Sequence, residues 1–174
     1  MQWAFTAEQL EFRAVLRRYF QDHCPPTEVR RLMATEAGWD AVRWKALNDD
    51  LGVGGVHIPE AYGGSGLPLT AAAVILEEIH RNGCNAAACH AQMYMMGTVL
   101  RHGSEAQKES YLPGIADGSL RLQAFGVTEP TSGTDTLALK TVARRDGDHY
   151  VVNGQKIWTS RAEHSDLMLL LART

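Results

Sequence analysis

The sequence changes its periodicity near Gly118, and this change constrains the fold more than any other feature of the chain. Before that point apolar residues recur at helical spacing, and capping-box pairs open helices at Thr6 and Ser104. After it, short apolar runs alternate with turn residues, a pattern typical of strands. The sequence therefore predicts an α+β chain, with an all-α helical bundle domain over residues 1–118 and a partial β-barrel domain over residues 119–174.

The helical half predicts six helices, and their expected ranges are residues 6–24, 28–34, 40–51, 70–81, 85–102 and 104–117. The helix over 85–102 is apolar on nearly every face, which predicts a buried central helix. The first two helices carry several arginines that we expect on a solvated face: Arg13, Arg17, Arg18, Arg30 and Arg31.

The second half predicts strands over residues 122–128, 138–145, 149–152 and 167–172, with a hairpin turn at 146–148. So few strands rarely make a closed sheet. We therefore expect the β domain to be incomplete in this chain.

Composition and charge exclude several classes of function. The formal net charge of -3 at pH 7 argues against a nucleic-acid-binding surface, and no apolar run is long enough to span a membrane. The seven histidines show no metal-ligand spacing, so no metal site is predicted. Cys24, Cys84 and Cys89 lack C-x-x-C spacing and fit reduced thiols in a cytoplasmic protein.

Two glycine-rich stretches invite a nucleotide-binding interpretation, which the sequence disfavours. In the stretch over residues 52–57, His57 occupies the third glycine position of a dinucleotide-binding fingerprint, and the surroundings are helical. The stretch over residues 62–66 is more simply a structural loop, because glycine marks turns first.

Two segments of the second half carry the chemical signal. The first runs from Phe125 to Asp135 and breaks at Pro130 into hydroxyl residues and a glycine. Small residues let a ligand approach the backbone closely, and amides in such loops bind anions. Taken alone, this segment could equally be an ordinary turn at the end of a strand, in which Glu129 anchors the loop.

The second segment, residues 153–160, adds the indole of Trp158 and two hydroxyls. A tryptophan alone is more often part of a core than the wall of a cofactor site. Together, however, the two segments resemble the flavin-binding signature of acyl-CoA dehydrogenases. Trp44, Leu47, Gly52 and residues 59–66 resemble the helical N-terminal domain of the same family, so the resemblance covers essentially the whole chain.

The resemblance implies an FAD-dependent enzyme that desaturates the α,β bond of an acyl-CoA thioester and passes hydride to flavin N5. The cofactor-binding residues that it implies are Phe125, Val127, Thr128, Gly133, Thr134, Trp158, Thr159 and Ser160. Within this set, Trp158 would pack against the isoalloxazine and Ser160 would hydrogen-bond near N5. The substrate-binding residues that it implies are Thr134, His90 and Tyr94, with Met93 a weaker candidate.

The family's catalytic base normally lies in the C-terminal half, so the resemblance assigns no catalytic residue to this chain. Glu77, Glu78 and Glu129 are not candidates. We therefore expect the chain alone to be inactive.

The implied partners are an acyl-CoA substrate, electron-transfer flavoprotein or another acceptor, and further copies of the chain in a homotetramer that serves fatty acid metabolism. Two alternatives stay open. One is a flavin oxidase or monooxygenase on the same fold, and the other is a non-catalytic helical binding fragment.

Overall fold

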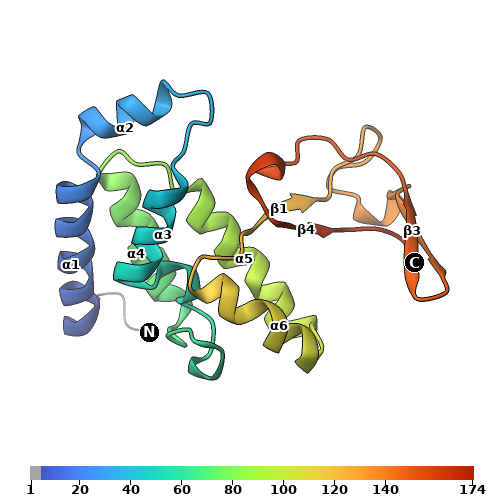
Figure 1. Cartoon of the computed structure of the whole chain (residues 1–174), viewed down its shortest axis with the longest axis horizontal. Coiled ribbons are helices and arrows are strands. Elements are labelled where there is room, and N and C mark those ends of the chain that lie inside the picture. The colour runs from blue at the N-terminus through green and yellow to red at the C-terminus, as the bar shows by residue number, and fades with distance from the viewer. Residues whose placement is uncertain (1–4) are drawn as a thin grey trace. The chain divides into compact units, whose positions relative to one another are not determined.

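The structure is a computed structural model that describes residues 5–174 of the chain. The described residues divide into two compact units, one that ends at Leu120 and one that runs from Arg121 to Thr174. The α-helices of the described residues all lie in the first unit, and the strands lie in the second (Figure 1). The predicted α+β fold is confirmed, and the division falls at Leu120 where the sequence suggested residue 118.

The helical unit contains every helix that the sequence predicts, with ends that differ by at most a few residues. The helices are α1 (Ala7–His23), α2 (Pro26–Met33), α3 (Ala41–Leu51), α4 (Leu69–Arg81), α5 (Ala87–His102) and α6 (Glu105–Ala116), joined in part by the 3-10 turns η1 (Val53–Gly55) and η2 (Glu60–Tyr62). Helix α1 packs along α4, and α5 packs against α6 (Figure 1).

The predicted helix caps form as the sequence indicates. Thr6 Oγ1 accepts a hydrogen bond from the Gln9 amide at 3.2 Å, and the Gln9 side chain accepts one from the Thr6 amide at 3.0 Å. Asp40 accepts from the amides of the first turn of α3, and Gly52 ends that helix at a φ of 60°. Glycine adopts this left-handed conformation without steric cost.

The turn η1 contacts α3, α5 and α6 in the core of the helical unit. Its glycines permit this approach, because a Cβ on Gly54 would lie 2.3 Å from Asn48 Oδ1 and one on Gly55 would lie 3.0 Å from Ala116 Cβ. Asn48 is buried, accepts from the Gly54 amide at 2.6 Å and donates to the Trp44 carbonyl at 2.7 Å. The first glycine-rich stretch is therefore a packed structural turn.

The second glycine-rich stretch is also structural. A Cβ on Gly64 would lie 2.0 Å from the Ile58 carbonyl oxygen and 2.6 Å from the Gly55 carbonyl oxygen. The Ser65 amide donates to that same Gly55 carbonyl at 3.0 Å. Close backbone packing, and not ligand binding, accounts for the glycine at this position.

The prediction of a solvated arginine face is wrong for Arg13. Its side chain is only 14% exposed, and its Nε lies 2.6 Å from Oε1 of the fully buried Glu78. Arg17, on the next turn of α1, donates to both oxygens of Glu78 at 3.0 and 2.9 Å. The hydrogen bonds from Arg17 and then Arg13 lower the pKa of Glu78 against the opposing effect of burial. Arg18 and Arg30 are exposed, as predicted.

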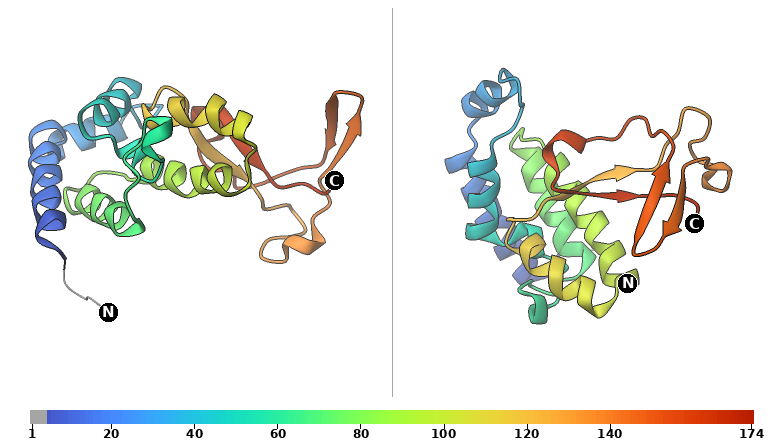
Figure 2. Two further views of the ribbon diagram at one scale, coloured as in Figure 1. Left: turned by 90° about the horizontal axis from the view of Figure 1, so that it is seen from below. Right: turned by 45° about the vertical axis from the view of Figure 1, so that its right-hand side comes forward.

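The β unit contains two separate strand pairs (Figure 2). Strand β1 (Leu122–Gly126) pairs in parallel with β4 (Leu167–Leu170), so the first and last strands of the unit are neighbours. Strands β2 (Val142–Asp146) and β3 (His149–Asn153) form an antiparallel hairpin around the predicted turn. The 3-10 turns η3 (Thr136–Ala138) and η4 (Ala162–His164) lie in the connections.

The strand predicted over residues 138–145 begins later than expected, at Val142. Ala138 belongs to the turn η3, and the amides of Lys140 and Thr141 donate to the carboxylate of Glu129 at 2.6 and 2.8 Å. These amides are therefore engaged by a side chain, which explains why the first residues of the predicted run do not join a strand ladder.

Candidate functional site

The structure brings the two predicted segments of the β unit together. The Ile157 amide donates to the Thr128 carbonyl at 2.9 Å, and Lys156 Nζ donates to the Val127 carbonyl at 2.9 Å. Lys156 Nζ also lies 2.9 Å from Glu129 Oε1, in an ion pair whose side chains are almost completely buried. Two adjacent residues of the second segment thus fix it against three consecutive residues of the first.

Glu129 anchors this junction, as the sequence suggested. Besides Lys156, its carboxylate accepts from the amides of Lys140 and Thr141. The neighbouring side chain of Thr141 and the hydrogen bonds from the amides of Lys140 and Thr141, with a smaller effect of Lys156, lower the pKa of Glu129 to about 2. A carboxylate that is ionised and so fully engaged is not suited to accept a substrate proton at neutral pH.

The loop after Glu129 is held by its own backbone. The Glu129 amide donates to the Ser132 carbonyl at 2.8 Å, the Ser132 amide returns a bond at 3.2 Å, and the Ser132 hydroxyl donates to the Asp135 carbonyl. Gly133 follows at an exposed position where an added Cβ would meet no atom within 4 Å. Packing within the chain therefore does not require a glycine there, which leaves room for a ligand to approach the backbone.

Trp158 does not belong to the core of the described unit. Its side chain is 85% exposed, and its backbone has a φ of 60°, which is uncommon for a residue with a Cβ. Arg161 has the same φ. Backbone strain of this kind costs roughly 1–3 kcal/mol and gathers at ligand sites. The Ile157 amide bond to Thr128 fixes the backbone immediately before Trp158 against the first segment, while the indole itself is exposed to solvent.

The hydroxyl groups around this junction are free to bind a ligand. Among residues 5–174, no hydrogen bond engages the side chains of Thr128, Thr134, Thr159 or Ser160. Thr134 and Ser160 are exposed, whereas Thr128 and Thr159 are half-buried. Phe125 and Val127, at the end of β1 and just after it, are also half-buried.

The predicted substrate residues lie on α5 in the helical unit. His90 and Tyr94 are one turn apart, and their rings meet edge to face with centroids 5.1 Å apart. His90 is exposed and Tyr94 is 44% exposed, so both reach the surface of that unit, while partial burial raises the pKa of Tyr94. Met93 is buried and packs in the core, which is the simpler of its two interpretations.

Lys156 is the residue of the site that sequence reasoning missed. The sequence did contain a signal for this role: a lysine stands in a segment that otherwise carries an aromatic ring and hydroxyls. A lysine that is buried there needs a partner of opposite charge. Glu129 in the other segment is that partner, and the pair joins two stretches that lie 27 residues apart.

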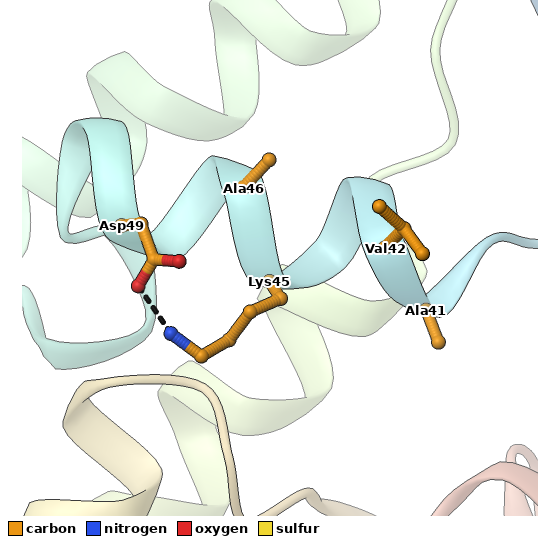
Figure 3. A pocket seen from close by; sticks show the side chains of 5 residues that line it. All are labelled: Ala41, Val42, Lys45, Ala46 and Asp49. Atoms are coloured by element: carbon orange, nitrogen blue, oxygen red, sulfur yellow. Dashed lines mark hydrogen bonds and ion pairs between the residues drawn. The ribbon is translucent and has the colours of Figure 1, made fainter.

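No cluster of metal-ligating side chains occurs within residues 5–174, and no helix there is long and apolar enough to cross a membrane. An open depression of about 420 Å³ follows one face of α3, where Lys45 pairs with Asp49 beside Ala41, Val42 and Ala46 (Figure 3). The two charged side chains that line the depression, Lys45 and Asp49, pair with each other.

Comparison with known proteins identifies this arrangement. Residues 6–119 match the family model for the N-terminal domain of acyl-CoA dehydrogenases, and residues 124–174 match the model for their middle domain. The helical unit and the β unit are thus the two domains in the order that the family has them. The chain belongs to the acyl-CoA dehydrogenase family.

Individual relatives agree with this assignment. Acyl-CoA dehydrogenase FadE29 of Mycobacterium tuberculosis is 37% identical over 172 residues, which cover 97% of this chain and 43% of that protein. Mitochondrial isovaleryl-CoA dehydrogenase of Bos taurus is 33% identical, over 96% of this chain and 39% of its own length. The solved Tcur3481-Tcur3483 steroid ACAD superposes with a TM-score of 0.84 at 37% identity, over 100% of this chain and 45% of that one. The chain spans about two fifths of the length of such relatives.

Proposed function

We propose that this chain provides the helical domain and the first flavin-contacting segments of an FAD-dependent acyl-CoA dehydrogenase, which desaturates the α,β bond of an acyl-CoA thioester. The observation that carries the proposal is the junction between the two segments. Lys156 and Ile157 fix residues 127–129 beside the exposed indole of Trp158. Exposure of a large aromatic side chain on a strained backbone costs free energy, unless a ligand covers the side chain.

The residues present fit FAD. The isoalloxazine needs a flat apolar surface, which Trp158 offers, and hydrogen-bond donors at its edge, which the uncommitted hydroxyls of Thr159 and Ser160 offer. Phe125, Val127 and Thr128 would face the ring system. Gly133 and Thr134 would lie near the pyrophosphate, where open space above the glycine admits a phosphate group to the backbone. Bound FAD would supply the acceptor for the hydride from the substrate's β carbon.

We assign Thr134 to the thioester and the His90–Tyr94 pair to the acyl pocket. None of the buried or paired acids discussed above supplies the base for the α proton, because Glu78 is held by arginines and Glu129 by amides and Lys156. We therefore expect the 174-residue chain alone to lack useful dehydrogenase activity, since general base catalysis contributes roughly 10²–10⁴-fold.

The proposal extends to partners and location. We propose electron-transfer flavoprotein or another acceptor as the oxidant, a homotetrameric assembly, and a role in fatty acid metabolism in the cytoplasm, where reduced cysteines are the rule. A relative whose name joins two components, the steroid ACAD, makes a hetero-oligomer the alternative assembly. Native mass spectrometry of the protein expressed alone distinguishes the two.

Titration with FAD tests the cofactor assignment, with Trp158→Ala as the variant. The control is Tyr150→Ala, which removes another exposed aromatic ring, 58% exposed on β3 and outside both segments. We expect Trp158→Ala to weaken FAD binding about tenfold, since a stacked aromatic pair is worth about 0.5–1.5 kcal/mol beyond the area it buries. The control should bind as the parent does. Equal losses in the two variants would remove Trp158 from the site.

The two open alternatives give different results in the same preparation. A chain that is colourless after incubation with FAD at high concentration and removal of the free FAD supports the non-catalytic binding protein. A flavoprotein that consumes oxygen and releases peroxide when acyl-CoA reduces it supports the oxidase or monooxygenase. The dehydrogenase instead passes its electrons to an artificial acceptor and reacts slowly with oxygen.

A further inference from the structure

Two cysteines that lie 60 residues apart in the sequence meet at one end of the helical unit. Cys24 directly follows α1, with its amide bonded to the Phe20 carbonyl, and Cys84 follows α4, with its amide bonded to the Ile79 carbonyl. Because α1 packs along α4, the two helix ends are neighbours. The Cys84 sulfur lies 4.0 Å from the Cys24 carbonyl oxygen. Both side chains are half-buried, so solvent reaches the pair.

A third element places a positive charge against this pair. Arg43 of α3 donates to the His23 carbonyl and pairs with Glu28 at 2.8 Å, so its guanidinium lies against the residue that directly precedes Cys24. The neighbouring thiol of Cys84 and the positive charge of Arg43 outweigh burial and lower the pKa of Cys24 to about 6. The same contact with Cys24, together with burial, raises the pKa of Cys84. The pair therefore consists of one thiolate and one thiol near neutral pH.

We propose that Cys24 and Cys84 form a peroxide-sensitive dithiol, in which Cys24 is the oxidised nucleophile and Cys84 closes an intramolecular disulfide with it. The proposal is independent of the flavin site. The oxidant is hydrogen peroxide. A thiolate near an arginine, with a second thiol close to the same residue, is the arrangement in which cysteines react selectively.

The chemistry balances with peroxide as the only co-reactant. The Cys24 thiolate attacks one peroxide oxygen, so that an S–O bond forms, the O–O bond breaks and hydroxide leaves. The sulfur has then lost two electrons and is a sulfenic acid. The Cys84 sulfur next attacks the Cys24 sulfur, the S–S bond forms, the S–O bond breaks, and the thiol proton leaves with the hydroxide as water.

The third cysteine of the chain provides an internal control. Cys89, on α5, is only 3% exposed, so it is expected to behave as an ordinary packed thiol. A general oxidation of the protein would modify all three cysteines or follow their exposure. The proposal instead requires that two of them react as a unit and that the third stays a thiol.

Alkylation kinetics at pH 6 test the nucleophile. At that pH about half of Cys24 is thiolate, against about 0.3% of an ordinary cysteine with a pKa near 8.5. The lower basicity reduces the reactivity of each thiolate roughly tenfold, so we expect Cys24 in the native chain to react with iodoacetamide about tenfold faster than Cys24 in urea. Peptide mass spectrometry assigns the rate to the residue. Equal rates in the folded and unfolded chain would overturn the proposal.

Peroxide treatment tests the pair. The parent and the control variant Cys89→Ser should each lose two hydrogen atoms and give a linked peptide that contains residues 24 and 84. Cys84→Ser should instead stop at a Cys24 sulfenic acid that dimedone traps, and Cys24→Ser should leave Cys84 reduced. Absence of the linked peptide in the parent, or a disulfide that joins two copies of the chain, would refute the intramolecular switch.

Discussion

Replacement of Asn48 by alanine should destabilise the helical unit more than any exposed substitution in it. The amide of this buried side chain joins two elements, because it donates to the Trp44 carbonyl one turn earlier in α3 and accepts from the amide of Gly54 in η1. It also lies against Gly118, where a Cβ would approach Asn48 Nδ2 to 2.6 Å. Asn48→Ala removes both hydrogen bonds and leaves the Gly54 amide buried without this partner.

The size of the effect follows from these contacts. Two intramolecular hydrogen bonds contribute about 1 kcal/mol each in net terms, and a buried amide without a partner costs about 1–3 kcal/mol. The Trp44 carbonyl stays within helix α3 in the variant, so the buried Gly54 amide without its partner accounts for most of the lost stability. We expect the free energy of unfolding to fall by about 3–4 kcal/mol, which raises the unfolding constant by roughly two to three orders of magnitude.

Urea denaturation followed by far-UV circular dichroism measures this loss, because the α-helices of residues 5–174 all lie in this unit. With a slope of about 1–3 kcal/mol per molar urea, the midpoint should fall by about 1–4 M. Asn82→Ala is a matched control. Asn82 also donates to the carbonyl four residues earlier, at 2.8 Å, but caps the end of α4 and has no buried amide to satisfy. We expect this control to lose no more than about 1 kcal/mol. Similar losses in both variants would refute the argument that the Gly54 amide sets the cost.

Three further predictions concern other parts of the chain. Glu78→Gln should make the free energy of unfolding less dependent on pH in acid. The folded-state pKa of Glu78 is lowered, so its contribution to stability is complete above the ordinary glutamate pKa of about 4.3 and disappears as the pH falls through the folded-state pKa. Urea midpoints measured from pH 7 to pH 3 for the parent and the variant test this. Gly154→Ala should make residues 121–174 more sensitive to limited proteolysis, because its Cβ would lie 2.3 Å from a threonine hydroxyl, whereas Gly133→Ala, which meets open space, should leave the digestion unchanged. Closure of the Cys24–Cys84 disulfide should raise the stability of the helical unit by up to about 4 kcal/mol, since it closes a loop of about 60 residues, and a urea midpoint that does not move on oxidation would contradict this.

The helices were predictable because their signals are local. The capping boxes at Thr6 and Ser104, the cap at Asp40 and the left-handed Gly52 each involve residues within one turn of a helix end. The exception is instructive. Arg13 belongs to a pattern that predicts exposure, but its partner Glu78 lies 65 residues further along the chain. No local pattern contains that pairing, so the buried ion pair could not be predicted.

The β unit was less predictable for the same physical reason. The apolar run that ends in β2 has strand-like composition from residue 138, but a single carboxylate, Glu129, engages the amides of Lys140 and Thr141 and postpones the strand. The candidate site was anticipated from the likeness of two segments to a known signature. Their fixation by Lys156 depends on a tertiary contact, and only the structure reveals it. The roles of the individual flavin and substrate residues stay predictions.

The parallel pairing of β1 with β4 dictates an order of events during synthesis of the chain. Leu122 lies opposite Leu167 and Gly126 opposite Leu170, so β1 has no partner strand until a further 40 or so residues have been made. At about 5–20 residues per second this delay lasts roughly 2–9 s, whereas helical units with local contacts fold in milliseconds or less. The helical unit can therefore be complete while β1, four of whose five residues are later buried, is still without its partner strand. During that interval the unpaired segment is open to non-native association with other chains, the hazard that chaperones counter.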